Sequence, residues 1–375
     1  MMTRLLHAFE ATWFEVLQAR ELVSLAIISV LFYAFYYPAP YSQQQALALP
    51  MVVVDRDRTP LSRAVIRHLG ETPTVRIVAL VPDIMAAREE VRQRRADGIL
   101  YLSKGLGGAA LKGRPGAGAA LIVNGTYFVR AEGIARALGD VVREQAVEVT
   151  GSLTARHSRS GATIVMQPLF NTTGGYRDYV FPAIANIILQ QTLLFASARL
   201  IAERRRRGDW QRDRATALGT WIAMTLIGIF AGLFVFGFAF WVQDVPRTGN
   251  VPGLLLALPV FAATVAALGL VAGSLFRSGD DALKLLMPTS VPLVFLAGFA
   301  WPLDEMPGWL AAIAWFSPAT AAMHLFIRFN QMGAPIAEAA TPLLVLIGLM
   351  IGYGAIWCFG RSHAGREDPT SDAAG

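Results

Sequence analysis

Residues Tyr179–Ala198 read YVFPAIANIILQQTLLFASA and contain no Asp, Glu, Lys or Arg. An uncharged run of about 20 residues is long enough to cross the hydrocarbon core of a bilayer as one helix. Arg199 follows at once, and Arg204–Arg207 come soon after. Basic residues next to an apolar run most often anchor a membrane span at its aqueous surface. This stretch therefore predicts a membrane protein.

The composition of the whole chain agrees with that prediction. The 375 residues are 54% hydrophobic and 16% charged, whereas a soluble domain carries close to 25% charged residues. The formal net charge is +6, but no aromatic interleaving or reading motif accompanies the basic residues, so we expect no nucleic acid as a partner. The single cysteine, Cys358, excludes an internal disulfide, a thiolate metal cluster and a CxxC redox pair.

Five further runs lack Asp, Glu, Lys and Arg, which brings the number of predicted spans to six. These runs are Leu22–Tyr37, Ala215–Val242, Val251–Phe276, Leu285–Leu303 and Thr341–Gly360. We interpret the first as an uncleaved helix. The segment before it is too long and too acidic for the start of a secretory signal, and no small-x-small cleavage site follows it.

The orientation of the spans follows from Lys and Arg in the short loops, because a long translocated segment does not obey the positive-inside rule. With the N-terminus inside, twelve basic residues lie on the inner side and two, Arg247 and Arg328, on the outer side. Both termini are therefore expected in the cytoplasm. The twelve inner residues are Arg4, Arg20, Arg204, Arg205, Arg206, Arg207, Arg212, Arg214, Arg277, Lys284, Arg361 and Arg366.

The first 20 residues predict an amphipathic helix. Phe9 and Trp13 recur at helical spacing with other apolar residues, while Glu10 and Glu15 lie on the opposite face. Beside a membrane span, such a helix is expected in the plane of the interface, with Trp13 at the depth of the lipid headgroups.

Residues 38–177 change character and predict a folded α/β module outside the cytoplasm. Short runs rich in Val and Ile alternate with amphipathic helical patterns. The expected strands are residues 49–54, 75–81, 98–102, 119–123 and 162–168, and the expected helices are residues 61–69, 83–95 and 129–157. Residues 104–118 contain six glycines and are expected to form a flexible loop.

For the residues that could bind a metal, a structural role explains the sequence better than a metal site does. Asp55 and Asp57 could meet one ligand, but each has an arginine beside it where a strand turns into a helix. Helix capping and local ion pairs are therefore favoured over a metal or acid/base site. The histidines His68, His157 and His324 have no ligand partner at metal spacing.

Amide side chains occur inside the second span, at Asn186, Gln190 and Gln191. Since an amide without a hydrogen-bond partner costs roughly a few kcal/mol in hydrocarbon, these groups are expected to face protein or water. Two interpretations stay open: hydrogen bonds between helices, or the lining of a substrate path. Pro288 and Pro292 in the fifth span remove backbone hydrogen bonds and are candidate bending points.

Residues 304–334 predict two short re-entrant helices on the outer side. The segment carries Trp309, Trp315 and Phe316, with prolines at both turns. A further full span would have to bury His324 and Arg328, which makes re-entry the preferred interpretation.

Several motifs together resemble those of a known family. They are VVVDRDRTPLSR at 52–63, the segment 171–182, FLAGFAWPLDEMPGW at 295–309, SPAT at 317–320 and RFNQMG at 328–333. In order and spacing, over nearly the whole chain, they resemble the permease subunits of type-2 ATP-binding-cassette (ABC) exporters. The resemblance is to the bacterial subgroup with a large periplasmic insertion after the first helix.

This resemblance implies export powered by a separate cytoplasmic ABC ATPase subunit. A second permease protomer, in a homodimer or a heterodimer, would complete the translocation path. The sequence has no G-x-x-x-x-G-K-[ST] loop, so ATP is expected to bind the partner, and no cofactor is expected in this chain. Membrane lipids are the remaining expected partner.

In the family, the loop between the second and third helices contacts the ATPase. Family members often have Glu-Arg-Glu-x-Gly-Thr there, whereas this chain differs at two positions. The residues implied in coupling are Glu203, Arg204, Arg205, Arg206, Arg207 and Gly208.

Movement of that loop is expected to rock the second helix against the fifth helix of the other protomer. The candidates for the translocation path or the dimer interface are Asn186, Gln190, Gln191, Pro288 and Pro292. The cargo is expected to be drug-like, lipid-like or otherwise amphipathic. By analogy with the family, the outer domain would hand it to a periplasmic membrane-fusion adaptor.

The sequence therefore predicts a mainly α membrane protein of the bacterial inner membrane. It would have six transmembrane helices, an α/β periplasmic domain inserted between helices 1 and 2, and re-entrant helices between 5 and 6. The expected boundaries are 1–20 for the interfacial helix, 21–37, 178–200, 215–242, 251–276, 284–303 and 340–360 for the spans, 38–177 for the periplasmic domain, 201–214 for the coupling loop, 304–334 for the re-entrant helices and 361–375 for a cytoplasmic tail.

Two other classes of function compete with a permease. A membrane-anchored periplasmic sensor or scaffold would lack transport activity and an ATPase partner. A membrane-embedded enzyme acting on lipid is disfavoured, because the sequence offers no paired carboxylates, His cluster or nucleophile elbow. No catalytic or metal site is expected.

Overall fold

The computed structural model describes residues 1–41, 48–93, 95–105, 119–123, 134, 137–139, 141, 176–210, 213–246 and 249–359. The chain divides into two compact units. One contains Met1–Ser42 and Leu169–Gly375, and the other contains Gln43–Pro168. The expected tail 361–375 and the expected strand 162–168 lie outside the described residues, as does most of the expected helix 129–157.

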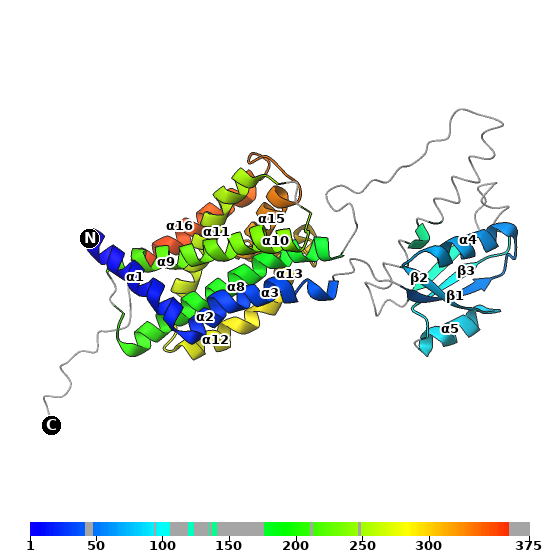
Figure 1. Ribbon diagram of the computed structural model, residues 1–375, viewed down its shortest axis with the longest axis horizontal. Helices are drawn as coiled ribbons and strands as arrows, with labels where there is room; N and C mark the ends of the chain where they lie inside the picture. The colour runs from blue at the N-terminus through cyan, green and yellow to red at the C-terminus, as the bar shows by residue number, and fades with distance from the viewer. Residues whose placement is uncertain are drawn as a thin grey trace, which may run out of the picture. The chain divides into compact units, whose positions relative to one another are not determined.

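The first unit is helical (Figure 1). Its elements are α1 (Met2–Gln18), α2 (Arg20–Val23), a π-helical turn (Ser24–Ile28), α3 (Ser29–Tyr36), a 3₁₀ turn (Ala39–Tyr41), α8 (Tyr176–Arg207), α9 (Arg214–Leu233), a second π-helical turn (Phe234–Ala239), α10 (Phe240–Val242), α11 (Val251–Gly273), α12 (Gly279–Leu286), a second 3₁₀ turn (Met287–Thr289), α13 (Ser290–Leu296), a short 3₁₀ helix (Leu303–Glu305), α14 (Gly308–Ala314), α15 (Pro318–Asn330) and α16 (Ala340–Phe359).

Four helices in the described residues are long and apolar enough to cross a membrane. They are Arg177–Arg207, Arg214–Val242, Val251–Gly273 and Ala340–Phe359. Two bent helix pairs raise this number to six if each pair counts as one span. Met2–Gln18 meets Arg20–Tyr36 at 83°, and Gly308–Ala314 meets Pro318–Asn330 at 80°.

The first bend separates the expected interfacial helix from the expected first span. It lies at Ala19, whose backbone is extended (φ −79°, ψ 109°). The second bend lies in the segment expected to be re-entrant, where Pro318 occupies the first position of α15. Proline suits that position, because the first amide of a helix has no partner within the helix.

The expected fifth span, residues 284–303, is not one continuous helix. Its helical structure is interrupted by the 3₁₀ turn Met287–Thr289 and stops at Leu296. Pro288 and Pro292 cannot donate backbone hydrogen bonds, and Gly298 has a left-handed φ of +92°. The prolines were expected to be bending points; Pro288 lies in the 3₁₀ turn, and Pro292 lies just after it, within α13.

Helix α8 is the central element of the helical unit. In its most apolar window 94% of the residues are buried, compared with 28% in α16. It packs against α11, α12 and α15. Gly269 and Gly273 let α11 approach closely, since a methyl group on Gly269 would lie 2.7 Å from the Ser197 Cβ. Small residues at such crossings are typical of helix packing in membranes.

The second unit contains a four-stranded sheet in the order β2-β1-β3-β4. Its strands are β1 (Leu49–Asp55), β2 (Val75–Leu80), β3 (Gly98–Leu102) and β4 (Ala119–Val123). The pairs β1–β2 and β1–β3 are parallel, and β4 is antiparallel to β3. Helices α4 (Pro60–Glu71) and α5 (Ile84–Arg92) connect the parallel strands, as expected from the sequence.

Candidate functional site

The candidate site is the C-terminal end of α8 together with the residues that contact it, which we call the α8 junction. Helix α8 ends at Arg207, and Gly208 follows with φ +76°. The Gly208 and Asp209 amides donate to the Arg205 and Arg204 carbonyl oxygens at 3.1 and 3.0 Å. This left-handed glycine stop explains Gly208, one of the residues implied in coupling.

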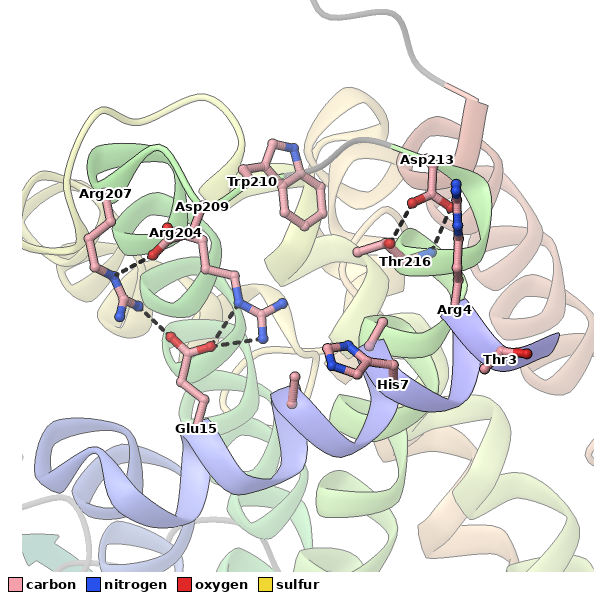
Figure 2. A pocket seen from close by; sticks show the side chains of 12 residues that line it. Thr3, Arg4, His7, Glu15, Arg204, Arg207, Asp209, Trp210, Asp213 and Thr216 are labelled. Carbon is pink, nitrogen blue, oxygen red and sulfur yellow. Dashed lines mark hydrogen bonds and ion pairs between the residues drawn. The ribbon is translucent and has the colours of Figure 1, made fainter. Parts of the chain in front are cut away.

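Arg204 is buried and joins three helices; Figure 2 shows its contact with Glu15. Its guanidinium donates to the Glu15 carboxylate at 2.8 Å, to the Thr12 hydroxyl at 2.9 Å and to the Thr220 hydroxyl at 3.1 Å. Thr12 and Thr220 are also buried. A buried guanidinium is tolerated when most of its donors are satisfied, as they are here. Arg204 therefore ties α1 and α9 to α8.

Small residues bring α1 close to α9. The buried stripe of α1 is Ala8, Thr12 and Val16, and a methyl group on Gly219 would lie 3.0 Å from the Ala8 Cβ. Leu6 and Leu17 stay exposed. The apolar face recognised in the sequence is therefore only partly used inside the chain, which leaves exposed side chains for contact with lipid.

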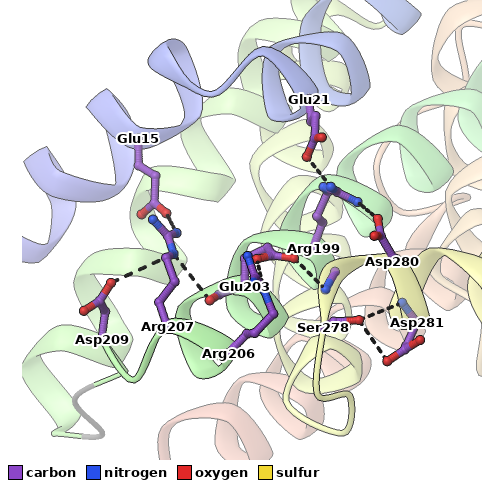
Figure 3. A network of polar contacts seen from close by, with 11 residues as sticks. Glu15, Glu21, Arg199, Glu203, Arg206, Arg207, Asp209, Ser278, Asp280 and Asp281 are labelled. Carbon is purple, nitrogen blue, oxygen red and sulfur yellow. Dashed lines mark hydrogen bonds and ion pairs between the residues drawn. The ribbon is translucent and has the colours of Figure 1, made fainter.

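Arg199 joins α8 to two other elements (Figure 3). It donates to Asp280, at the start of α12, at 2.8 Å and forms an ion pair with Glu21 of α2. Hydrogen bonding and charge attraction from Arg199 lower the pKa of the Asp280 carboxyl. The Gly279 amide donates to Glu203 at 3.0 Å. The end of α8 thus holds the first turn of α12.

The remaining arginines differ in exposure. The Arg205 guanidinium donates to the Phe276 carbonyl oxygen at 3.3 Å. Arg206 pairs with Glu203 at 2.7 Å, and Arg207 pairs with Glu15. The exposed fractions of the side chains are 60% for Arg206 and 47% for Arg207, compared with 10% for Arg204. Two arginines are therefore open to a partner, and Arg204 is not.

Two open clefts flank these arginines. One, of about 680 Å³, lies between α1 and the start of α9, and Figure 2 shows Arg4, His7 and Glu15 facing it from α1. The other, of about 560 Å³, lies beside Arg199 and Arg206. Trp210, in the wall of the first cleft, packs on Trp357 of α16 with ring centroids 5.0 Å apart. The chain leaving α8 is therefore held against the bundle.

The structure thus separates the six residues implied in coupling. Glu203, Arg204 and Arg205 hold neighbouring elements, and Gly208 ends the helix. Arg206 faces outward, and Arg207 is about half exposed while it pairs with Glu15 of α1. Sequence reasoning missed the partners Thr12, Thr220, Arg199 and Asp280. Only Arg199 left a signal in the sequence, as the first charge after an uncharged run.

The second set of candidate residues does not form one site. Asn186, Gln190 and Gln191 are buried in the chain, whereas Pro288 and Pro292 are exposed. Gln190 accepts from the Ala319 amide at 2.6 Å, and Gln191 donates to Ser290 at 2.8 Å. These contacts agree with the interpretation of hydrogen bonds between helices.

No group of three His, Cys, Asp or Glu that could hold a metal occurs among the described residues. Asp55 accepts hydrogen bonds from the Asp57 and Arg58 amides at 3.0 and 2.9 Å and from the Ser62 hydroxyl at 3.0 Å. Asp57 accepts from the Gly105 amide at 2.7 Å. These carboxylates accept local hydrogen bonds at the strand-to-helix turn. The expected helix cap is provided not by an aspartate but by Thr59, whose hydroxyl accepts from the Ser62 amide at 3.3 Å.

Residues 20–359 match the family described as "ABC-2 family transporter protein". The chain is 20% identical over 205 residues to the probable multidrug ABC transporter permease YbhR of Escherichia coli K12, an alignment that covers 53% of this chain and 55% of YbhR. The chain therefore spans about half the length of that relative. It is 21% identical over 336 residues to the linearmycin resistance permease protein LnrN of Bacillus subtilis, covering 82% and 85% of the two chains. Nodulation protein J of Rhizobium leguminosarum is 32% identical over 36% of this chain and 47% of its own.

Proposed function

The chain belongs to the ABC-2 family of transporter proteins, and from that premise we propose that it is the permease subunit of an exporter driven by a separate cytoplasmic ATPase. The observation that carries the proposal is the α8 junction. Arg206 and Arg207 are exposed on a helix end that is tied to α1, α9 and α12 through Arg204, Arg199 and Glu203. A push on these two arginines would therefore move several helices together.

In this proposal the α8 junction faces the cytoplasm of a bacterial cell, and both chain termini lie on that side of the inner membrane. The unit that contains the sheet then lies in the periplasm. The excess of Lys and Arg in the short inner loops supports this orientation. Exposed apolar side chains on α16, such as Leu344 and Ile351, suit contact with lipid.

A second permease protomer would pack on the broken segment α12–α13. This segment exposes Leu285, Val291 and Phe295 beside Pro288 and Pro292. Exposed apolar groups on a broken helix suit a protein neighbour better than lipid, because a neighbour can satisfy the backbone groups that the prolines leave free. The interface could be built from two copies of this chain or from this chain and a related one.

The proposed cargo is a drug-like or lipid-like amphipathic molecule. Two relatives support this class by name, one as a probable multidrug permease and the other as a linearmycin resistance protein. We also propose that the sheet-containing unit passes cargo to a periplasmic adaptor of the membrane-fusion type.

Charge reversal at the exposed arginines tests the proposal. In Arg206→Glu/Arg207→Glu, ATP-dependent export into inside-out vesicles should be lost, because the contact with the ATPase would become repulsive. Membrane insertion should stay at the wild-type level. Arg88→Glu, an exposed arginine on α5, is the matched control and should export normally. Normal export by the double variant would contradict the coupling role of this helix end.

Co-purification of the wild-type chain tests the competing class of function. A wild-type chain that co-purifies with no ATPase would favour the membrane-anchored sensor or scaffold.

A further inference from the structure

Two consecutive glutamines in the middle of α8 each contact a break in a different helix. Gln190 reaches the bend between α14 and α15, and Gln191 reaches the 3₁₀ turn between α12 and α13. Consecutive residues on a helix point about 100° apart, so one position on α8 can serve two neighbours. Both glutamines are almost fully buried, with exposed fractions of 3% and 6%.

Gln190 caps α15 from outside that helix. The natural cap, Ser317, makes no side-chain hydrogen bond to the first turn of α15, and Pro318 has no amide hydrogen. The Ala319 amide instead donates to the Gln190 Oε1 at 2.6 Å, and the Ser317 hydroxyl lies 3.3 Å from the same oxygen. The first free amide of α15 therefore depends on a side chain of α8.

Gln191 holds the other break through hydroxyl groups. Its Nε2 donates to the Ser290 Oγ at 2.8 Å, at the first residue of α13, and lies 3.4 Å from the Thr289 Oγ1. Thr289 in turn donates to the Leu286 carbonyl oxygen at 2.6 Å, at the last residue of α12. A helix break inside a membrane persists when neighbouring side chains satisfy the polar groups that it frees.

Asn186, one turn earlier in α8, behaves differently. It is fully buried, but its amide donates only within its own helix, to the Pro182 carbonyl oxygen at 2.9 Å. The three buried amides of α8 therefore have distinct roles, and Asn186 provides a matched control for the other two.

We propose that Gln190 and Gln191 are positioning residues that make α15 and α13 follow α8 during transport. This inference rests on the proposed function, because it assumes that α8 is the helix that the ATPase moves. The consequence is that one displacement of α8 shifts the re-entrant segment and the broken fifth segment together. Without these side chains, each segment would keep its fold and its apolar packing on α8 but lose its hydrogen bonds to that helix.

The test compares near-isosteric variants in full-length protein, purified with its ATPase and placed in lipid nanodiscs. Hydrogen exchange of peptides covering 317–330 and 287–296 is measured at rest and after trapping with ATP and orthovanadate. In Gln190→Met at rest, the Ala319 amide should exchange about tenfold faster, as the loss of one hydrogen bond of ordinary strength allows. The change on trapping should disappear from 317–330 and persist in 287–296.

Gln191→Met should give the converse pattern, and Asn186→Leu should leave both changes intact. Gln190→Glu retains an oxygen for the Ala319 amide and should restore the response in 317–330. A purely structural role would alter exchange at rest but would not remove a nucleotide-dependent change from one segment alone.

Export measured in the same variants distinguishes a failure of the positioning role from a failure of the proposed function. If wild-type protein exports with ATP and Gln190→Met keeps both full export and the trapped-state change in 317–330, the positioning role is wrong and the proposed function stands. If wild-type protein itself shows no ATP-dependent export or exchange response, the proposed function is wrong and the positioning role falls with it.

Discussion

At the scale of single residues, Arg204 is the side chain on which the attachment of α1 most depends. Among the described residues, its guanidinium is the group that bonds Glu15, Thr12 and Thr220 together. Breaking a buried ion pair costs about 3–5 kcal/mol. Arg204→Met should cost less, about 2 kcal/mol, because Glu15 keeps its pair with Arg207 and is partly exposed. Arg206→Met should change the free energy of unfolding by less than about 0.5 kcal/mol. Denaturant unfolding in detergent measures both, and equal losses would contradict the distinction.

Gly219 provides a second prediction at this scale. A methyl group there would meet the Leu5 carbonyl oxygen and lie 3.0 Å from the Phe9 amide nitrogen, both in the backbone of α1. Because backbone atoms cannot turn aside, Gly219→Ala should destabilise the protein by about 1–3 kcal/mol and raise proteolysis in α1.

The matched control for Gly219 is Gly348 in α16. Apart from its chain neighbours and the nearby backbone of α16, no atom of the described residues lies within 4 Å of a methyl group added there. Gly348→Ala should therefore stabilise the protein by about 0.5–1 kcal/mol through helix propensity. Thermal unfolding should give a lower midpoint for Gly219→Ala and a higher midpoint for Gly348→Ala than for the wild type. Shifts of the same sign would contradict the close packing of α1 on α9.

These residues also show what the sequence could not provide. The sequence predicted Arg204 in a coupling loop at 201–214, whereas the structure places it within α8. Its partner Thr12 lies 192 positions away along the chain. A threonine on the face of an amphipathic helix carries no sign of such a contact. Arg204 and Arg206 look alike in the sequence, and only packing distinguishes a buried arginine from an exposed one.

At the scale of elements, the sequence was most informative where periodicity was uniform. The strands at 98–102 and 119–123 match β3 and β4 in both bounds. The expected fifth span differs from the structure, which has a 3₁₀ turn at Met287–Thr289 and no α-helix after Leu296 until Gly308. An uncharged run reports hydropathy, which is the same for a continuous helix and for two short ones. The break follows from two prolines and from side chains of α8 that stabilise it.

The contact between α8 and α12 carries a prediction about pH. Hydrogen bonding to Arg199 lowers the pKa of Asp280 below its ordinary value of 3.8. A carboxyl whose pKa is lower in the folded state stabilises that state above its unfolded pKa. That contribution is lost as the pH falls through the folded-state pKa. The contact should therefore be intact from pH 5 to pH 8 and weaken only below about pH 4.

A spin label at Lys284→Cys in a Cys358→Ser background reports this contact, because Lys284 is an exposed residue of α12. The label should be equally restricted at pH 5 and pH 8 and more mobile below pH 4. In Asp280→Asn the carboxylate is absent, so the label should be mobile at every pH. A wild-type label that loosens between pH 8 and pH 5 would show that another group holds α12.

At the scale of the whole molecule, the orientation in the membrane links the α8 junction to the proposed source of energy. The distribution of charge predicts this orientation, since basic residues concentrate in the short loops on one side of the expected spans. Arg206 and Arg207, the two arginines that are open to a partner, belong to these basic residues. An ATPase in the cytoplasm can reach them only if this side faces inward.

Cysteine labelling tests the orientation directly, because Cys358 is the single native cysteine and can be replaced by serine. Arg206→Cys should react with a membrane-impermeant maleimide only after the inner membrane is opened. Arg88→Cys, in the sheet-containing unit, should react in cells whose outer membrane alone is permeable. Both sites are exposed on helices, so a difference in labelling reports the side of the membrane and not burial. Labelling of Arg206→Cys with the inner membrane intact would place the α8 junction away from any cytoplasmic motor. In that arrangement the buried contacts of Arg204 and Arg199 could stabilise the fold but could not transmit ATP-driven movement.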